Sequence, residues 1–320
     1  MSTILKKLKK QISTKRIFRA MGTEAYIEIV HTGDQKKRSE VSLTKVINVC
    51  FSKVKIFNRF DQDSEICAIN RQLKAFVDAS PDMLTVAMHA LAYSKESKGI
   101  FDPRILLILE NIGYRSDFSS KEMFFKLGKK IIFPKTPLAD DLKIWGELIQ
   151  FNVPMDFSGI AKGYILDRMA DTLIEDGCEN FLIDVGGDMR AFGKNKEGKD
   201  WCIDIENAPT DALLNLSDNG IATSGITRRR WMMENEGYHH LIHPSHPYEF
   251  SFELLSVTAI SQSAERADFL AKTLFLMGLK EGMKTAKKHS IPAIFIKNSE
   301  TDKKNEWKVS PATKKYFVKK

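Results

Sequence analysis

The chain has 320 residues, of which 43% are hydrophobic and 10% aromatic, enough to bury the core of one large domain or two small ones. A formal net charge of +8 favours anionic partners, but no zinc-finger, RRM or helix-turn-helix pattern supports nucleic-acid binding. No apolar run approaches the roughly 18 residues that span a bilayer, so we expect no integral membrane segment. The basic N-terminus lacks the features of a secretory signal or a lipoprotein anchor, so we expect a cytoplasmic protein.

The cysteines and the charged ends of the chain indicate which segments belong to the folded domain. None of the four cysteines forms a CxxC pair and each lies in an apolar stretch, which is typical of buried thiols. Basic runs stand at both ends, KKLKK and KKYFVKK, and such runs are usually solvated. We therefore expect a basic lead-in over residues 1–15, a single domain over 16–310 and a basic tail over 311–320. The single domain can consist of two lobes.

Taken in chain order, the hydrophobic patterns predict an α+β fold without regular βαβ alternation. Strands are predicted over 17–30, 201–207 and 291–297, and a strand, turn and strand over 181–193. Helices are predicted over 36–57, 82–98, 161–176 and 264–277, with a short one following Ser64. Ser64 is a helix N-cap signal and Gly99 a C-cap signal. Residues 115–150 are less regular, with strand-like KKIIF.

The segment MDFSGIAKGYILD, residues 155–167, is the densest in possible chemistry. Asp156 precedes the start of a helix that contains Lys162. Small residues in this segment let the backbone come close to a ligand, namely Ser158, Gly159, Ala161 and Gly163. Helix N-termini present unpaired N–H groups and a positive dipole end, which suit a phosphate, and Lys162 adds a positive charge. The alternative is an ordinary glycine-rich turn with a solvent lysine. A Walker P-loop is excluded because GxxxxGK[ST] is absent.

Two further segments combine glycine with polar groups. IDVGGDMRAFG contains Gly186 and Gly187, which suit a hairpin turn or a close approach to a ligand. IATSGITRRR offers hydroxyls and amides in a Thr-Ser-Gly turn. Its three arginines, residues 228–230, are either phosphate contacts or charges that protect an exposed strand edge.

The last two segments contain possible cation ligands. HHLIHPSHP, residues 239–247, gathers four of the seven histidines, but zinc sites usually add carboxylates or cysteines. His239 and His240 would also point in opposite directions on a strand. AERADFLAKTLFLMG, residues 264–278, has an apolar helix face beside Asp268. A carboxylate there needs a partner, either a salt bridge or a bound cation.

The order of these segments resembles that of the ApbE family of flavin-handling proteins. The matching stretches span residues 19–278 and are RAMGTEAYI, FDQDSEICAIN, GIFDP, MDFSGIAKGYILD, LIDVGGDM, IATSG, HHLIHP and SVTAISQSAERADFLAKTLFLMG. The resemblance implies an ApbE-type (T-fold-like) mixed sheet and helix architecture, with an FAD pocket between its two lobes. It also implies an FAD:protein FMN transferase. In that reaction Mg²⁺ bridges the FAD pyrophosphate, a Thr or Ser hydroxyl of an acceptor protein attacks the FMN phosphorus, and AMP leaves.

The resemblance also implies roles for individual residues. Asp156, near the flavin or the acceptor hydroxyl, and Lys162, near FAD, match the catalytic positions. The backbone carbonyl of Gly159 and the carboxylate of Asp268 match the metal ligands. The positions implied to bind FAD are Met21, Phe60, Phe101, Asp102, Asp156, Lys162, Ser224, Gly225, His240, Ile242 and Lys272.

Three motifs depart from the family pattern. The family's metal motif has a threonine four residues after the aspartate, where this chain has Lys272. Thr273 cannot simply substitute, because one residue turns a helix by about 100°. The Lys272 ammonium would either replace Mg²⁺ in binding the pyrophosphate or repel it. Arg104 replaces a family threonine. In a third motif, His243 replaces a family aspartate and Pro247 a family glycine.

These departures leave other functions open beside transfer. One is a catalytically degenerate FAD-binding paralogue, in which Lys272 stands in for the metal. Another is an FAD pyrophosphatase, in which water replaces the acceptor and free FMN and AMP are released. A basic nucleic-acid-binding module is supported by net charge alone.

Overall fold

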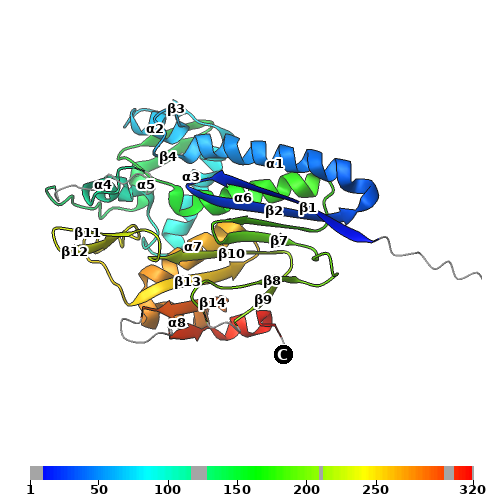
Figure 1. The fold of residues 1–320 in the computed structure, drawn as a ribbon. Helices are drawn as coiled ribbons and strands as arrows, with labels where there is room; N and C mark the ends of the chain where they lie inside the picture. The colour runs from blue at the N-terminus through cyan, green and yellow to red at the C-terminus, as the bar shows by residue number, and fades with distance from the viewer. Residues whose placement is uncertain (1–9, 117–127, 209–211, 299–305, 319–320) are drawn as a thin grey trace, which may run out of the picture.

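A large antiparallel sheet organises the computed structural model, which describes residues 10–116, 128–208, 212–298 and 306–318 (Figure 1). Its strand order is β1-β2-β6-β7-β10-β13-β14-β15. The bounds are β1 Gln11–Ala20, β2 Thr23–Thr32, β6 Phe181–Val185, β7 Asp188–Phe192, β10 Asn219–Gly225, β13 Leu254–Ser261, β14 Ala293–Lys297 and β15 Trp307–Val309.

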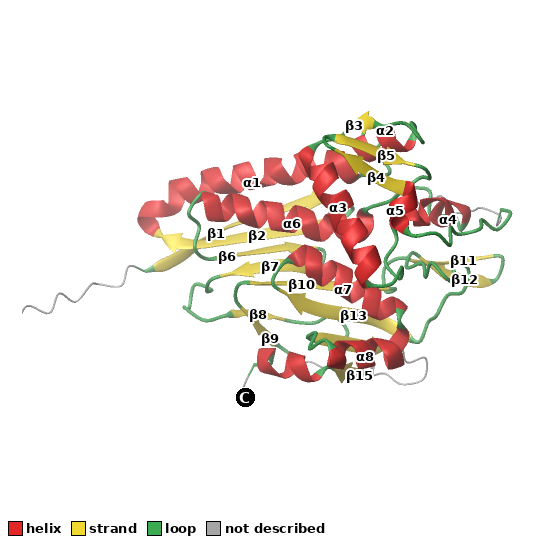
Figure 2. Cartoon of the chain, turned by 180° about the vertical axis from the view of Figure 1, so that it is seen from behind, coloured by secondary structure: helices red, strands yellow, loops and turns green. Residues whose placement is uncertain are grey.

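Helices cover one face of this sheet, as Figure 2 shows for α1, α6, α7 and α8. The helices are α1 Lys36–Phe57, α2 Glu65–Asn70, α3 Pro81–Glu96, α4 Leu106–Asn111, α5 Leu138–Asp141, α6 Ser158–Glu175, α7 Ala264–Leu276 and α8 Gly278–Lys288. Short 3-10 turns lie at Gly33–Gln35, Pro103–Ile105 and Pro311–Tyr316. Among the described residues, no helix combines the length and the apolar character that crossing a membrane requires.

Small sheets complete the described architecture. β3 Val77–Asp78, β5 Leu148–Phe151 and β4 Leu142–Trp145 form one of them beside α2. The hairpin of β11 Arg230–Met233 and β12 Glu236–His239 lies near α4, and β8 Trp201–Ile203 pairs with β9 Leu214–Leu216.

The core consists of separate apolar clusters. One packs β2 and β6 against α1 and α6, with fully buried Ile27, Leu43 and Leu166. A second packs β13 and β14 against α7 and α8. A smaller one joins α4 to the β11–β12 hairpin and includes Ile108 and Tyr238. α7 therefore contributes to both larger clusters, and α6 packs beside it in the first.

Several predicted elements are confirmed. The helix over 36–57 is α1, and Ser64 caps α2 because its Oγ accepts the amide of Cys67 at 3.3 Å. Gly99 lies just past the end of α3, has φ +82° and donates its N–H to the carbonyl of Ser94 in the last turn of that helix, as expected of a C-cap. The strand, turn and strand over 181–193 is the β6–β7 hairpin, with Gly186 and Gly187 both at positive φ.

Other element predictions are wrong. The single strand predicted over 17–30 is the β1–β2 hairpin, and its turn at Met21 and Gly22 has φ +52° and +72°. β1 starts at Gln11, so it includes part of the expected lead-in. Residues 129–133 form no strand, and α8 follows α7 without having been predicted.

The expected solvated tail and the expected burial of every cysteine also need correction. The 3-10 turn at Pro311–Tyr316 contains fully buried Thr313, whose Oγ1 accepts the amide of Ala293 at 2.8 Å. Cys202 is exposed on β8, because its side chain points away from the second cluster. All four thiols are free.

Candidate active site

The start of α6 holds Asp156 in place. Its Oδ1 accepts the amide of Ser158 at 2.7 Å, and its Oδ2 lies 3.2 Å from Nε of Arg59. Both side chains are buried, with 1% of Asp156 and 4% of Arg59 exposed. Oδ2 nevertheless has no hydrogen-bond partner. A buried carboxylate requires such compensation, and Arg59 supplies it as an ion pair.

Arg59 contacts both the Asp156 carboxylate and two aromatic side chains. Its guanidinium lies 4.1 Å from the ring centre of Phe60 and 4.5 Å from that of Tyr114, and it donates to the Tyr114 carbonyl at 2.9 Å. The ring of Tyr114 in turn meets the ring of His240 edge-on. The candidate flavin-pocket residues Phe60 and His240 therefore lie along one line of contacts that begins at Asp156.

Lys162, one turn further along α6, reaches the large sheet. Its Nζ lies 2.6 Å from Oδ2 of Asp188, the first residue of β7, and 27% of the lysine side chain is exposed. The other oxygen of Asp188 accepts the amide of Thr223 on β10 at 2.9 Å. An ion pair and a backbone hydrogen bond thus fix a partly exposed ammonium beside the predicted Thr-Ser-Gly segment.

Asp268 and Lys272 lie on α7, opposite the start of α6. Lys272 Nζ donates to the carbonyl of Gly159 at 3.0 Å and lies 3.4 Å from Oδ1 of Asp268. Burial raises the pKa of Asp268 to about 6, and the ammonium of Lys272 acts in the opposite direction. Oδ2 of Asp268 has no hydrogen-bond partner. The structure thus brings together the two expected metal ligands, with a lysine between them.

Close packing of α6 on α7 sets this geometry. A Cβ placed on Gly163 would lie 2.4 Å from the Cα of Glu265, so only glycine fits there. Asp167 of α6 also accepts the amides of Ala264 and Glu265, both at 2.9 Å, and so caps α7. Gly163 was expected to admit a ligand; it admits a neighbouring helix instead.

Arg104 does not extend a free charge toward a polyanion. The guanidinium is buried and donates to both carboxylate oxygens of Asp102, to Asp141 at 2.6 Å, and to the Thr136 carbonyl at 2.9 Å. Two carboxylates therefore neutralise the Arg104 guanidinium, which offers no free charge to a ligand. Asp102, expected to bind FAD, has both oxygens engaged by Arg104.

The remaining candidate residues surround these groups. Phe101 is buried, and its ring lies 3.2 Å from where a Cβ on Gly159 would stand. Met21 occupies the β1–β2 turn, and Thr23, the first residue of β2, contacts the position that a Gly186 side chain would take. Ser224 and Gly225 are the last two residues of β10. Ile242 packs in the cluster that joins α4 to the β11–β12 hairpin.

The clustered histidines have separate environments. His239 is buried among Phe250, Phe252 and Phe275, and this burial lowers its pKa to about 4. Burial also lowers the pKa of His240, whose Nδ1 faces the Arg229 carbonyl at 3.3 Å. In the parts of the chain that the structure describes, no group of three His, Cys, Asp or Glu side chains could hold a metal.

A divalent ion does not fit the two implied ligands as they stand. Mg²⁺ binds oxygen at about 2.0–2.1 Å and requires octahedral coordination. The Lys272 ammonium already contacts both the Gly159 carbonyl and Asp268, so an ion bound to both oxygens would require the lysine to leave. The structure therefore supports no step that passes through a metal at this position.

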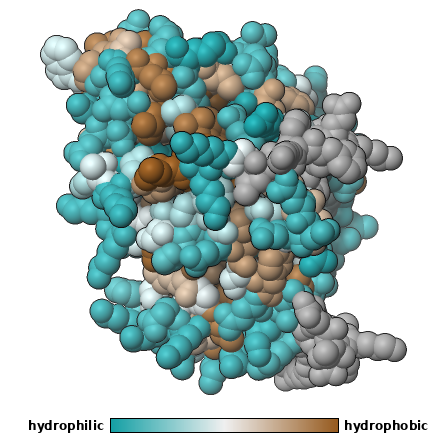
Figure 3. All heavy atoms as spheres, turned by 90° about the vertical axis from the view of Figure 1, so that its left-hand side faces the viewer, coloured by the Kyte–Doolittle hydropathy of each residue, from teal (hydrophilic) through white to brown (hydrophobic). Residues whose placement is uncertain are grey.

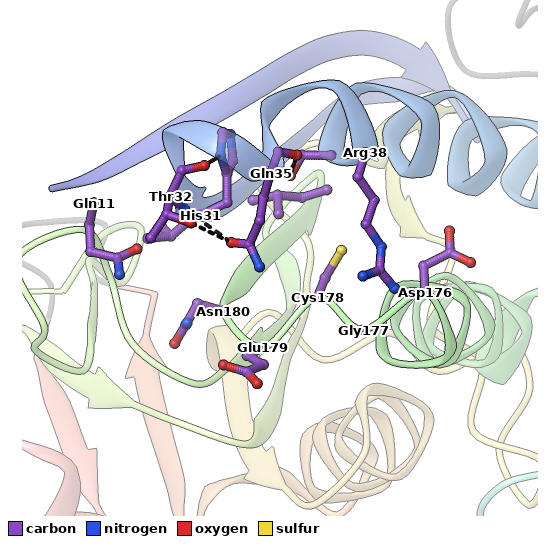
Figure 4. A pocket seen from close by; sticks show the side chains of 13 residues that line it. Gln11, His31, Thr32, Gln35, Arg38, Asp176, Gly177, Cys178, Glu179 and Asn180 are labelled. Atoms are coloured by element: carbon purple, nitrogen blue, oxygen red, sulfur yellow. Dashed lines mark hydrogen bonds between the residues drawn. The ribbon is translucent and has the colours of Figure 1, made fainter. Parts of the chain in front are cut away.

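A polar cavity of about 180 Å³ lies away from these residues, at the other end of α6 (Figure 4). Its lining residues are Gln11, Ile29, Val30, His31, Thr32, Gln35, Arg38, Ser39, Asp176, Gly177, Cys178, Glu179 and Asn180. None of the predicted site residues is among them. Ligand pockets for drug-sized molecules have about 300–1,000 Å³, so this cavity is too small for a dinucleotide.

The face that carries β11 and β12 has apolar side chains among hydrophilic ones (Figure 3). Met232 on β11 is 67% exposed and Leu107 on α4 is 39% exposed. Both elements belong to the cluster that includes Ile242 and contacts Arg59 through Tyr114. The candidate site therefore lies next to a partly apolar surface.

Comparison with known proteins decides the family. The ApbE family model matches residues 21–295, most of the chain. The chain belongs to the ApbE family. Its curated relatives include proteins named FAD:protein FMN transferase from Haemophilus influenzae, 25% identical over 87% of this chain and 84% of the relative, and from Vibrio cholerae, 29% identical over 74% and 73%.

Solved ApbE structures confirm the predicted fold. The flavin transferase ApbE from Vibrio cholerae is 25% identical, superposes with a TM-score of 0.76, and the match covers 96% of this chain and 99% of that one. The apo flavinyl transferase ApbE from Pseudomonas stutzeri is 23% identical with a TM-score of 0.80, over 97% and 98%. This ApbE chain thus has the α+β architecture that its motif order implied.

Sequence reasoning missed three residues of the candidate site, Arg59, Tyr114 and Asp188. Arg59 directly precedes Phe60, but nothing in the sequence marks it as buried. Asp188 belongs to the LIDVGGDM segment, where only the glycines were considered. Asp184 and Asp188 lie on neighbouring strands on either side of the Gly186-Gly187 turn. This pair of aspartates beside a glycine turn is the sequence feature that could have indicated Asp188.

Proposed function

We propose that this chain is an FAD:protein FMN transferase, which moves FMN from FAD to a Thr or Ser hydroxyl of an acceptor protein and releases AMP. Membership of the ApbE family and the names of its curated relatives support this proposal. The observation that carries it is a pair of partly exposed ammonium groups beside the start of α6, Lys162 on α6 and Lys272 on α7. A pyrophosphate requires such concentrated positive charge.

The residues of this chain divide the work in this proposal. Lys162, held by Asp188, binds a phosphate oxygen of FAD, and the amide groups at the start of α6 add their dipole. Phe60, Tyr114 and His240 border the flavin. The acceptor oxygen forms a bond to the FMN phosphorus while the bond to the AMP phosphate breaks, and AMP takes the leaving electron pair.

The proton of the acceptor hydroxyl also needs a destination. Asp156 is the candidate, because its Oδ2 has no hydrogen-bond partner and the residue begins the segment that carries Lys162. Arg59 positions this carboxylate. The Mg²⁺ implied by the resemblance enters none of these steps, since Lys272 lies between its two expected ligands.

The test uses the full chain, FAD, and a redox-pump subunit that carries a Thr/Ser flavinylation motif. We expect AMP, measured by chromatography, in equal amount to the flavin that stays on the denatured acceptor. AMP with free FMN and an unlabelled acceptor would instead identify a pyrophosphatase. Bound FAD without AMP would identify a flavin-binding paralogue.

Lys162→Ala should lower the rate of AMP release by about 10- to 100-fold, because it removes a charged hydrogen bond to the phosphate. The matched control is Lys45→Ala, which removes an ion pair with Asp176 at the far end of α6. An equal effect of both substitutions would remove Lys162 from the proposed mechanism.

A further inference from the structure

Lys272 joins two oxygens from different helices. Its ammonium donates to the Gly159 carbonyl on α6 at 3.0 Å and lies 3.4 Å from the Asp268 carboxylate on α7. Its Cε would lie 3.3 Å from a Cβ on Gly159, so the alkyl chain packs directly on the start of α6. The lysine is thus seated between the helices rather than extended into solvent.

The charge balance of the site depends on this lysine. Asp268 is buried, with 7% of its side chain exposed, and Lys272 is its ion-pair partner. Removing one partner of a buried pair leaves an uncompensated charge, which is strongly destabilising. A divalent ion placed at the same oxygens would face the ammonium at close range, where like charges repel. Lysine and metal therefore compete for one position.

The ammonium still has capacity for a ligand. It carries three donors, of which one is directed to Gly159 and one faces Asp268. The side chain is 18% exposed, so the third donor can reach a ligand that covers the site. Thr273 cannot share this role, because its Oγ1 is buried without a partner on another side of α7.

We propose that the Lys272 ammonium is the resident cation of this site and binds the FAD pyrophosphate in place of a divalent ion at Gly159 and Asp268. The inference rests on the proposed function in one respect, namely that FAD is the ligand. It predicts a flavin site that works in the presence of a chelator.

The first test measures FAD affinity of the wild-type chain by flavin fluorescence, in EDTA and in millimolar Mg²⁺. We expect the two dissociation constants to agree within about twofold, because a covalently held cation cannot be chelated. A loss of affinity of about tenfold or more in EDTA would overturn the proposal, since that is the behaviour of a site that depends on a bound metal.

The second test exchanges the lysine for a smaller side chain. Lys272→Thr should weaken FAD binding in EDTA by at least about tenfold, the effect of losing one charged hydrogen bond, and Mg²⁺ should restore it. Lys53→Thr is the matched control, because Lys53 is also a partly buried lysine in an ion pair, with Asp82 at 2.6 Å. Equal losses in the two variants would contradict a specific role for Lys272.

The third test needs no flavin. Free Mn²⁺, followed by its electron paramagnetic resonance signal, should remain free beside the wild-type chain and bind to Lys272→Thr. A wild-type chain that binds one Mn²⁺ as tightly as the variant would overturn the proposal. If the wild type binds no FAD with or without Mg²⁺, the proposed function fails, and the Mn²⁺ comparison alone still decides whether Lys272 occupies the cation position.

Discussion

At the scale of single residues, buried carboxylates and their cations define the candidate site. Asp156 pairs with Arg59, Asp188 with Lys162, and Asp268 with Lys272. The sequence shows which residues carry charge, but a partner from a distant segment becomes visible only in the fold. Buried ion pairs of this kind restrict how the surrounding side chains can be arranged, and they place two ammonium groups beside one helix start.

His239 should make the protein less stable in acid. Its pKa is lowered to about 4 in the fold by burial, whereas an unfolded histidine has about 6.5. The neutral ring therefore contributes stability that is present above pH 6.5 and is lost as the pH falls toward 4, because the unfolded chain binds the proton first. Between pH 7 and pH 5 the loss is about 2 kcal/mol.

Urea unfolding of the wild type and of His239→Gln at both pH values measures this loss. We expect the variant, although less stable at pH 7, to lose about 2 kcal/mol less on acidification. His289→Gln is the control, because His289 is exposed at the end of α8. Identical losses in wild type and His239→Gln would show that another group controls the acid sensitivity.

At the scale of elements, the sequence predicted those with strong local signals. α1, α2 and the β6–β7 hairpin have clear periodicity, a cap, or a glycine turn. The β1–β2 turn was missed because Met21 is at positive φ without a strong turn motif. α8 was missed because its face toward the core is only Leu279, Gly282 and Ala286, and glycine has low helix propensity.

Close approaches between elements could not be predicted, because a glycine in a sequence does not reveal what faces it. Gly163 was expected to let the backbone approach a ligand because it is small, whereas in the structure it faces Glu265 of α7. The resemblance paired Gly159 with Asp268 as metal ligands, and the fold does bring the two residues together, but the contact of Lys272 with both of them was not visible in the sequence. The sequence pattern thus identified the segments that form the candidate site, whereas the contacts that each residue makes depend on how the helices pack.

Gly163→Ala should separate α6 from α7. The new Cβ would lie 2.4 Å from the Glu265 Cα and 2.6 Å from the Ala264 carbonyl oxygen, and backbone cannot yield as a side chain can. We expect the free energy of unfolding to fall by about 2–3 kcal/mol, despite the better helix propensity of alanine. Gly33→Ala is the control, because no atom lies within 4 Å of its new Cβ. A stability equal to that of the control would contradict this account of the crossing.

At the scale of the whole molecule, one sheet passes through both larger apolar clusters. β2 and β6 belong to the first cluster, β13 and β14 to the second, and the intervening strands connect them without a break. The order of motifs along the sequence was sufficient for the architecture, because that order is shared with the family. The placement of FAD between two lobes remains a proposal.

The continuous sheet predicts that the chain unfolds as one unit, as the proposed single domain over 16–310 requires. Gly163→Ala perturbs the first cluster. Thr313→Val perturbs the second, where the Thr313 hydroxyl bonds both the amide and the carbonyl of Ala293, and should cost about 2 kcal/mol. Because β6, β7 and β10 join the clusters, each variant should shift one common melting transition, the same by far-UV circular dichroism and by tryptophan fluorescence. Two separate transitions, only one of them moved by Thr313→Val, would mean that the sheet divides on unfolding and that the chain behaves as two lobes.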